Sequence, residues 1–278
     1  MANITAADVN KLRKMTGAGM MDCKLALIES EGDYEKAIEI LRKKGQKVAA
    51  KRADREASEG IVIAKTTTDN KFGALVMVNS ETDFVSRSED FVTYTKSVLE
   101  VAVKMQPKSM EELKSLNLNG RTVAENLSDL IGKTGEKLEL GAYDFIQAPF
   151  VTAYNHQGNR LATLLGVNKN DTPAIEEVAH ELAMQVAAMS PVAVDKEDVD
   201  PKVIEKEIEI GKEQARLEGK PENMLEKIAF GKLNKFYKDS TLLNQDFVRD
   251  HTKTVRQYLD SFGKELTVTG FRRQMLGS

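Results

Sequence analysis

The chain contains a single cysteine, Cys23, and no tryptophan among its 278 residues. With one cysteine, no internal disulfide can form. Long apolar runs are missing as well, and none reaches the length that a membrane-spanning helix requires. The first residues, MANITAADVN, lack the basic and apolar regions of a signal peptide. These absences predict a soluble, cytoplasmic protein that binds no membrane.

A strong net charge is also missing, because 40 basic residues stand against 43 acidic ones. The formal net charge of -3 gives no global basic field to attract DNA, RNA or anionic lipid, so any such binding has to be local. Residues 42–55 are the exception, with seven basic residues and one acid. We interpret this stretch as a helical linker. The alternative is a ribosome- or nucleic-acid-binding adaptor, whose phosphate contacts would make binding strongly salt dependent.

No glycine-containing segment meets the requirements of a nucleotide site. Residues 132–134, GKT, look like the end of a phosphate-binding loop, but Leu127 stands where that loop needs its first glycine. Gly17 and Gly19 follow a helical pattern, and Asp22 occupies the third glycine position of a dinucleotide fingerprint. We therefore expect no cofactor.

Histidine and cysteine are too scattered to form a metal site or a nucleophilic site. His180 precedes a glutamate, as in a zinc-protease helix, but Met184 occupies the position of the second histidine. Cys23 has no neighbouring histidine and lies among apolar residues, which favours packing over nucleophilic catalysis. The sequence predicts a protein without catalytic residues, without a metal and without covalent chemistry.

The first forty-odd residues carry three amphipathic patterns and predict a three-helix bundle over residues 4–44. Thr5 and Asp8 form a candidate capping box for the first helix, and Asp33 can cap the third. A bundle of this size must pack its apolar faces closely, because small domains bury little surface. The stripes expected to face inward are Val9, Leu12 and Met15; Met21, Leu25 and Ile28; and Tyr34, Ala37, Ile38 and Leu41.

Beyond the basic stretch, strands and helices alternate. Runs at 61–64 and 72–78 predict a hairpin of mostly buried strands, a second group of strands begins near residue 150, and Ser86 and Thr172 are candidate caps of the helices that follow. Two charged helices predict a projecting antiparallel hairpin, and the chain ends in a helix and a strand. The class is therefore α+β. The predicted units are 1–45 (bundle), 46–59 (basic helical linker), 60–148 (core N-subdomain), 149–194 with 239–278 (core C-subdomain) and 195–238 (inserted helical hairpin).

Five motifs are spread in order over nearly the whole chain. They are MTGAGMMDCK at residues 15–24, ETDFV at 81–85, LAMQVAAMSP at 182–191, GKPEN at 219–223 and EKIAFGKLNKF at 226–236. Together they make the sequence similar to bacterial elongation factor Ts, the exchange factor for elongation factor Tu. The resemblance implies a ubiquitin-associated-like bundle, two sheet-and-helix subdomains and an inserted hairpin. It also implies a non-enzymatic nucleotide exchange factor that binds elongation factor Tu in its GDP-bound and nucleotide-free forms.

The resemblance assigns the main partner contact to the TDFV motif, which here is Thr82, Asp83, Phe84 and Val85. Phe84 would insert between two helices of the partner's GTP-binding domain and disturb its magnesium site. Because magnesium neutralises the nucleotide phosphates, this would promote GDP release and allow GTP to rebind. The alternatives are that Phe84 folds back into its own core, and that Asp83 is a helix cap or a turn residue.

Two further regions resemble partner contacts of the family. Arg13, Met20 and Met21 match contacts from the bundle to a helix of the GTP-binding domain, although methionines at a helix turn are more often core, which leaves open that one of the two is buried. His156 and Gly158 lie in a hairpin turn that matches a region near another partner domain.

The sequence leaves the oligomeric state and one alternative function open. In some relatives the helical hairpin serves dimerisation or partner contact, so a homodimer or a 2:2 complex through the hairpin or the C-subdomain remains an alternative. A binder of ubiquitin-like proteins that uses the bundle alone is another, and it would bind through residues 1–44 without the rest of the chain.

Overall fold

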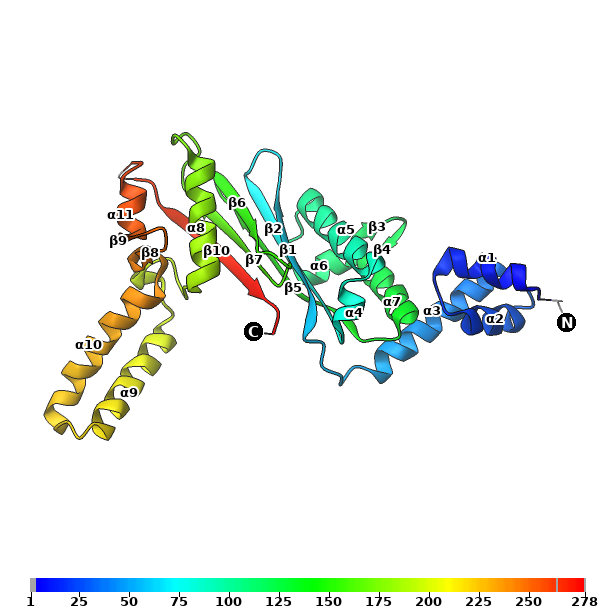
Figure 1. Cartoon of the computed structure of the whole chain (residues 1–278), viewed down its shortest axis with the longest axis horizontal. Helices are drawn as coiled ribbons and strands as arrows, with labels where there is room; N and C mark the ends of the chain where they lie inside the picture. The colour runs from blue at the N-terminus through cyan, green and yellow to red at the C-terminus, as the bar shows by residue number, and fades with distance from the viewer. Residues whose placement is uncertain (1–3, 264, 278) are drawn as a thin grey trace.

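The computed structural model describes residues 4–263 and 265–277 of the chain. Helices make up 52% and strands 22%, which confirms the α+β class. Figure 1 shows an elongated molecule with the N-terminal helices at one end, two sheets and their covering helices in the middle, and a helical hairpin projecting at the other end. In the ranges described, no helix is long and apolar enough to cross a membrane.

The N-terminal bundle consists of α1 (Ala6–Thr16), α2 (Met20–Glu29) and α3 (Tyr34–Lys51). Thr5 and Asp8 form the predicted capping box, and the Asp33 carboxylate accepts hydrogen bonds from two backbone N–H groups at the start of α3. Gly17 ends α1 in the left-handed conformation, with a φ of 68°.

Most of the basic stretch, residues 42–51, belongs to α3, and the stretch forms no separate helix. α3 continues through it without a break to Lys51, and residues 52–58 then turn into the first strand. The first half of α3 closes the bundle through Ala37, while Gly45 in its second half lies against α7 (Val123–Thr134). One helix therefore connects the bundle to the rest of the molecule.

The first sheet is antiparallel and has the order β1-β2-β5. Its strands are β1 (Glu59–Thr66), β2 (Phe72–Ser80) and β5 (Leu138–Gln147). The core lies between this sheet and its helices, where Phe72 and Phe91 are fully buried. The elements that follow β2 are α4 (Asp83–Ser86), α5 (Glu89–Met105), α6 (Met110–Ser115), β3 (Asn117–Leu118), β4 (Arg121–Thr122) and α7.

The second sheet has the order β10-β7-β6 and is also antiparallel. It consists of β6 (Phe150–Asn155), β7 (Leu161–Val167) and β10 (Val268–Met275). α8 (Ile175–Met189) covers its outer face, where Leu182 packs with Leu165. Short elements complete this part: η1 (Lys196–Asp198), η2 (Leu242–Asn244), β8 (Asp246–Phe247), β9 (Asp250–Thr254) and α11 (Val255–Asp260).

The two sheets pack face to face. Val62 and Leu75 of the first sheet share a buried cluster with Val151 and Leu164 of the second. Gly73 permits this approach, because a Cβ at that position would lie 2.9 Å from both Leu164 and Val151. β7 is buried along its whole length, since one face meets the first sheet and the other meets α8. Its sequence is therefore apolar except for Thr163, whose buried hydroxyl donates to the Ala183 carbonyl at 2.9 Å.

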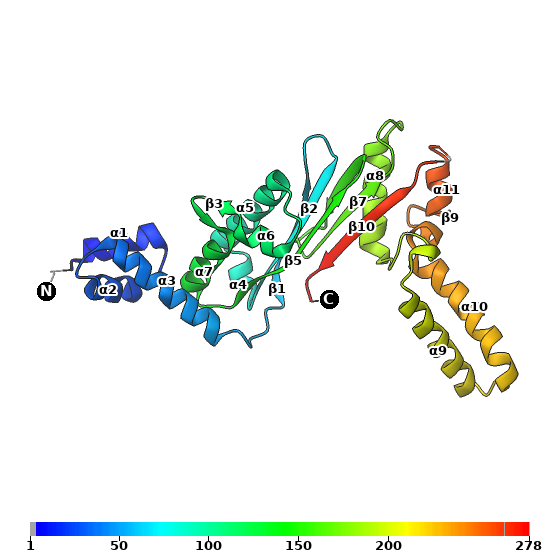
Figure 2. The same cartoon turned by 180° about the vertical axis from the view of Figure 1, so that it is seen from behind.

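The helical hairpin consists of α9 (Pro201–Leu217) and α10 (Glu222–Ser240), and it projects from the body in both views (Figures 1 and 2). The Asp200 carboxylate caps α9, whose first residue is Pro201. Gly211 lets the two helices approach closely, because a Cβ there would lie 3.1 Å from the Cα of Ala229. This confirms an antiparallel hairpin of two charged helices.

Some boundaries differ from the prediction for local reasons. α8 begins at Ile175 rather than after Thr172. Ser88 rather than Ser86 caps α5, because Ser86 is the last residue of α4 and α5 begins only at Glu89. The last helix, α11, is only six residues long, and β10 runs on to Met275 because it pairs with all of β7.

Candidate partner-binding surface

The TDFV segment forms most of a one-turn helix. Thr82 is at the N-cap position of α4, and Asp83, Phe84 and Val85 are its first helical residues. Phe84 is 86% exposed, so the interpretation in which it folds back into its own core is wrong. Val85 is half-buried and packs against the core beside α5. The turn therefore directs an aromatic side chain outward and anchors its other apolar side chain inward.

Asp83 is the first residue of α4 and is not its cap. Its Oδ2 lies 3.0 Å from Nη2 of Arg87, one turn later. A carboxylate in the first turn also interacts favourably with the positive end of the helix dipole. The side chain remains partly exposed, so this ion pair and a partner contact are compatible.

Thr82 is held from outside α4 by Glu136. The Thr82 backbone N–H donates to Oε2 of Glu136 at 3.1 Å, and the Thr82 hydroxyl donates to Oε1 at 2.7 Å. Ser80, which is fully buried, adds a hydrogen bond from its hydroxyl to the Thr82 carbonyl at 2.9 Å. The backbone at the start of α4 is thus fixed on two sides.

Glu81, the residue before this turn, is a second anchor. Nη1 of Arg52 lies 2.7 Å and 2.8 Å from its two carboxylate oxygens, and the backbone N–H of Lys137 donates to Oε1 at 2.6 Å. The Lys137 hydrogen bond, followed by the Arg52 interaction, lowers the pKa of Glu81 below its ordinary value. Arg52 directly follows α3, so this carboxylate joins the end of α3 to the TDFV turn.

The bundle exposes the residues that the resemblance identifies. Arg13 is exposed, Met20 is 52% exposed and Met21 is 63% exposed, so the alternative in which one methionine is buried is wrong. The predicted inward stripe of α2 is also wrong, because Leu25 and Ile28 face solvent beside Met21. The residues of α2 that pack inward are Cys23, Ala26 and Leu27.

The helix α2 is therefore apolar on two opposite sides. Met21, Leu25 and Ile28 follow an i, i+4, i+7 spacing and lie on one side of the helix. Packing within the bundle uses the other side. The exposed side is a candidate binding surface, because large apolar side chains grouped on a surface are typical of a binding site.

The turn between β6 and β7 contains His156 and Gly158, and both are exposed. His156 Nδ1 lies 2.8 Å from the Tyr154 hydroxyl, and Gly158 has a φ of 86° with open space around it. The turn is fixed to the first sheet by Asn155, whose side chain hydrogen-bonds both the N–H and the carbonyl of Ala64, at 2.7 Å and 2.9 Å.

This turn and α4 lie at the same end of the two sheets. Arg160 Nη1, just after the turn, is 2.5 Å from Oε2 of Glu59, the first residue of β1. Glu59 pairs with Ser80, the last residue of β2 before α4. Phe84 and the His156 turn therefore both lie toward the end of the sheets where β2 ends. Arg13, Met20 and Met21 flank the α1–α2 turn of the bundle, whose Gly17 lies against Lys133 of α7.

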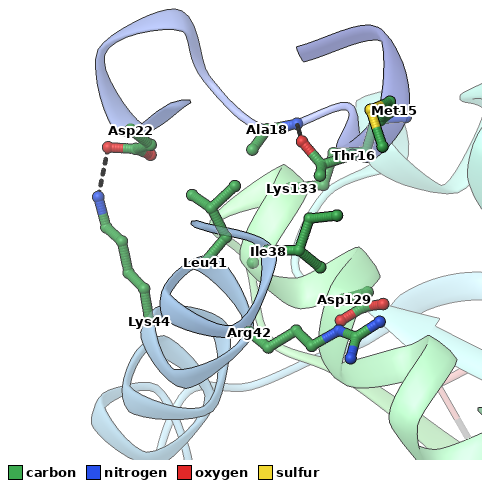
Figure 3. A pocket seen from close by; sticks show the side chains of 11 residues that line it. Met15, Thr16, Ala18, Asp22, Ile38, Leu41, Arg42, Lys44, Asp129 and Lys133 are labelled. Carbon is green, nitrogen blue, oxygen red and sulfur yellow. Dashed lines mark hydrogen bonds and ion pairs between the residues drawn. The ribbon is translucent and has the colours of Figure 1, made fainter. Parts of the chain in front are cut away.

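A cleft of about 210 Å³ lies between the bundle and α7 (Figure 3). On the bundle side Asp22 pairs with Lys44, and the side chain of Arg42 extends toward Asp129 of α7. Lys133, from the GKT segment that looks like a phosphate-binding loop, lies so close to Gly17 that a Cβ there would meet its side chain at 2.4 Å. This segment serves as a contact between the bundle and the core.

The chemistry available at these places is recognition. Among the described residues, no group of three or more histidine, cysteine, aspartate or glutamate side chains could hold a metal ion. Cys23 is buried in the bundle. What the surface offers is an exposed phenylalanine on an anchored turn, together with exposed apolar and polar side chains on the bundle and on the β6–β7 turn.

Sequence reasoning missed the residues that hold the TDFV turn, namely Arg52, Glu81 and Glu136. Glu136 lies 54 positions from Thr82, and Arg52 lies 29 positions from Glu81. No local pattern signals a hydrogen bond over such distances. The one available hint was Glu81 itself, which belongs to the ETDFV motif.

Comparison with known proteins gives a consistent result. A family profile described as Elongation factor TS matches residues 81–278. A protein of Cytophaga hutchinsonii named Elongation factor Ts is 55% identical over 274 residues, which cover 98% of this chain and 99% of the relative. Proteins of the same name from Christiangramia forsetii and Flavobacterium psychrophilum are each 50% identical over 277 residues and are covered in full.

Proposed function

This chain belongs to the elongation factor Ts family, and on that basis we propose that it releases GDP from elongation factor Tu by inserting Phe84 into the partner. The observation that carries the proposal is the exposure of Phe84 on an anchored turn. A phenylalanine left 86% exposed gains little in the free protein. Burying it in a partner would contribute about 1.5–3 kcal/mol to the binding free energy. This free energy can offset the partner's affinity for nucleotide.

The proposed mechanism involves no covalent step. Phe84 enters between two helices of the GTP-binding domain and displaces the groups that hold magnesium, so the nucleotide phosphates lose part of their charge neutralisation. Asp83 lies beside Phe84 on the same exposed turn and contributes a second contact. Coupling between two ligands is reciprocal, so bound GDP weakens binding of this chain by the same factor.

The bundle and the β6–β7 turn supply affinity in this proposal. Met20 and Met21 offer exposed apolar contacts and Arg13 a charge, while His156 and Gly158 contact another part of the partner. α3 joins the bundle to the TDFV turn through Arg52 and Glu81. A rigid connection favours simultaneous docking, because less conformational freedom is lost on binding.

The test is the release of a fluorescent GDP analogue from elongation factor Tu with and without the protein. The wild type should accelerate release, and Phe84→Ala should lower the rate at limiting concentration about 10- to 150-fold, as loss of a buried phenylalanine predicts. Met105→Ala is the control, since Met105 is also an exposed apolar side chain but lies at the opposite end of α5 from α4.

Each outcome has a clear meaning. Equal acceleration by the wild type and Phe84→Ala would remove the wedge role and keep exchange activity. If the folded wild type does not accelerate release at all, the proposal of nucleotide exchange is wrong. The basic stretch at residues 42–55 would then make a nucleic-acid or ribosome adaptor the next hypothesis to test.

A further inference from the structure

We propose that Glu136 is the positioning residue of Phe84, which means that its carboxylate holds α4 in the conformation that presents the phenylalanine to a partner. The inference deepens the proposed function and rests on it for its effect on nucleotide release. Its structural part, that Glu136 restrains Phe84 in the free protein, stands on the contacts of this chain and can be tested without the partner.

The helix α4 is too short to be stable by itself, so its shape depends on contacts with the rest of the chain, among them the packing of Val85 and the hydrogen bond from Ser80 to Thr82. It has four residues, Asp83–Ser86, and helices this short are unstable in isolation because nucleation is costly. Thr82, at the N-cap position, makes no side-chain hydrogen bond to the helix it precedes. Phe84 adds no restraint, because a side chain that is 86% exposed has little of its surface packed against its own fold. The direction of Phe84 therefore depends on what holds the backbone of α4.

Glu136 supplies this restraint from a different part of the chain. Both of its carboxylate oxygens are used on Thr82, one by the backbone N–H at 3.1 Å and one by the hydroxyl at 2.7 Å. The hydroxyl that usually caps a helix by accepting a hydrogen bond here donates one to a carboxylate instead. Hydrogen bonds to a charged acceptor are among the stronger ones.

The position of Glu136 is itself well defined. It follows Gly135, which ends α7 in the left-handed conformation with a φ of 71°, and it lies two residues before β5 begins at Leu138. Its carboxylate is thus attached to a helix and a strand that are both packed in the core. The helix α7 and the strand β5 therefore fix the position of the carboxylate that binds Thr82.

The carboxylates of Glu81 and Glu136 hold different parts of the molecule. Glu81 accepts from the Lys137 backbone and from Arg52, so it joins α3, β2 and β5. Glu136 accepts from Thr82. Substitution of Glu81 therefore disturbs several elements, whereas substitution of Glu136 acts on the start of α4. This makes Glu136 the cleaner site for a test.

The first measurement follows the exposed side chain directly. The chain has no tryptophan, so Phe84→Trp introduces a single fluorescent reporter at the position in question. Its steady-state anisotropy should fall when Glu136→Ala is added, because the indole gains local motion as α4 loosens. Glu139→Ala is the matched control, since Glu139 is a partly exposed carboxylate three residues later that pairs with Lys137 rather than with Thr82.

The second measurement is a double-mutant cycle in GDP release from elongation factor Tu, with thermal unfolding of each full-length variant as a check of the fold. Glu136→Ala should lower the release rate about 5- to 30-fold, the factor expected for loss of charge-assisted hydrogen bonds at a partly exposed site. Glu136→Gln should lower it less, because the amide keeps one acceptor. In a Phe84→Ala background, Glu136→Ala should have almost no further effect.

The two measurements separate the possible failures. Unchanged anisotropy in Phe84→Trp with Glu136→Ala would overturn the positioning role, whatever the release rates are. Equal losses of rate in the wild-type and Phe84→Ala backgrounds would overturn it too, because the effect would not run through Phe84. If Phe84→Ala itself releases GDP at the wild-type rate, the proposed wedge fails, and a lowered anisotropy would then confine Glu136 to a structural role in α4.

Discussion

Gly45 on α3 and Gly132 on α7 lie in direct backbone contact. A Cβ placed on Gly45 would lie 3.1 Å from the Cα of Gly132 and 2.8 Å from the carbonyl oxygen of Ser128. Helices approach this closely only where side chains are absent. Since α3 also forms part of the N-terminal bundle, this crossing fixes the bundle against the core, and Lys133 beside Gly17 adds a second contact.

Gly45→Ala should destabilise the protein. The added methyl group meets backbone atoms, which cannot move aside like the end of a side chain, so we expect a loss of about 1–3 kcal/mol in the free energy of unfolding. Gly231→Ala in α10 is the matched control, because a Cβ there has open space around it. It should gain about 0.5–1 kcal/mol, the usual benefit of alanine over glycine inside a helix. Urea unfolding of both variants measures the difference.

Opposite signs for these two glycine substitutions are the important outcome. A Gly45→Ala protein as stable as Gly231→Ala would mean that α3 and α7 separate at no cost. The bundle would then be free to move relative to Phe84, and simultaneous docking of both would lose its structural support.

Phe84→Ala and Phe91→Ala should differ sharply in stability. Phe84 is exposed, so its removal should change the free energy of unfolding by less than about 0.5 kcal/mol. Phe91 is fully buried between α5 and the first sheet, and its removal should cost about 3–5 kcal/mol. Chemical denaturation checks both. A large loss of stability in Phe84→Ala would show that this side chain supports the fold. A slower GDP release by this variant could then result from unfolding rather than from loss of the partner contact.

Met20→Ala combined with Met21→Ala should weaken binding to elongation factor Tu without weakening the fold. Both side chains are exposed, and truncation of interface residues that carry binding energy costs more than about 1 kcal/mol, or roughly fivefold in affinity. Titration calorimetry measures the affinity. Ile28→Ala is the control on the same helix, about two turns away. A loss in Ile28→Ala as large as in the double variant would mean that the partner covers the whole exposed side of α2.

Much of the fold could be predicted from local patterns. The capping box of Thr5 and Asp8, the strand pair that became β1 and β2, and the proline-initiated α9 all depend on residues that are close in sequence. Such features are decided by neighbours, so the sequence contains the information needed to place them.

The side of α2 that packs inward could not be predicted in the same way. Its sequence is apolar on two sides, and periodicity alone favoured Met21, Leu25 and Ile28 as the buried set. The structure buries Cys23, Ala26 and Leu27 instead. Two of these three, Cys23 and Ala26, are small, which suits the close packing of a small bundle.

Long-range contacts account for the parts of the site that were missed. The exposure of Phe84 was expected only because of the family resemblance, since a loop phenylalanine alone is more often buried. Glu136 and Arg52 could not be found at all, because each acts on a residue far away in the sequence. The contact of Gly132 with Gly45 likewise joins residues far apart in the sequence, so it needed the structure.

The contacts of Glu81 with Arg52 and Lys137 should make the free energy of unfolding depend on pH in a defined range. The pKa of Glu81 is held below its ordinary value of 4.5, first by the Lys137 N–H and then by Arg52, so the folded state favours the charged carboxylate. Its contribution is complete above pH 4.5 and is lost as the pH falls through the lowered pKa. The difference in the free energy of unfolding between the wild type and Glu81→Gln should therefore be constant from pH 7 to about pH 5 and shrink below that. Other carboxylates with lowered pKa values, such as Asp8, are present in both proteins and cancel in the difference. A difference that does not change between pH 5 and the acid limit of folding would mean that the charge of Glu81 is not what holds α3 to the TDFV turn.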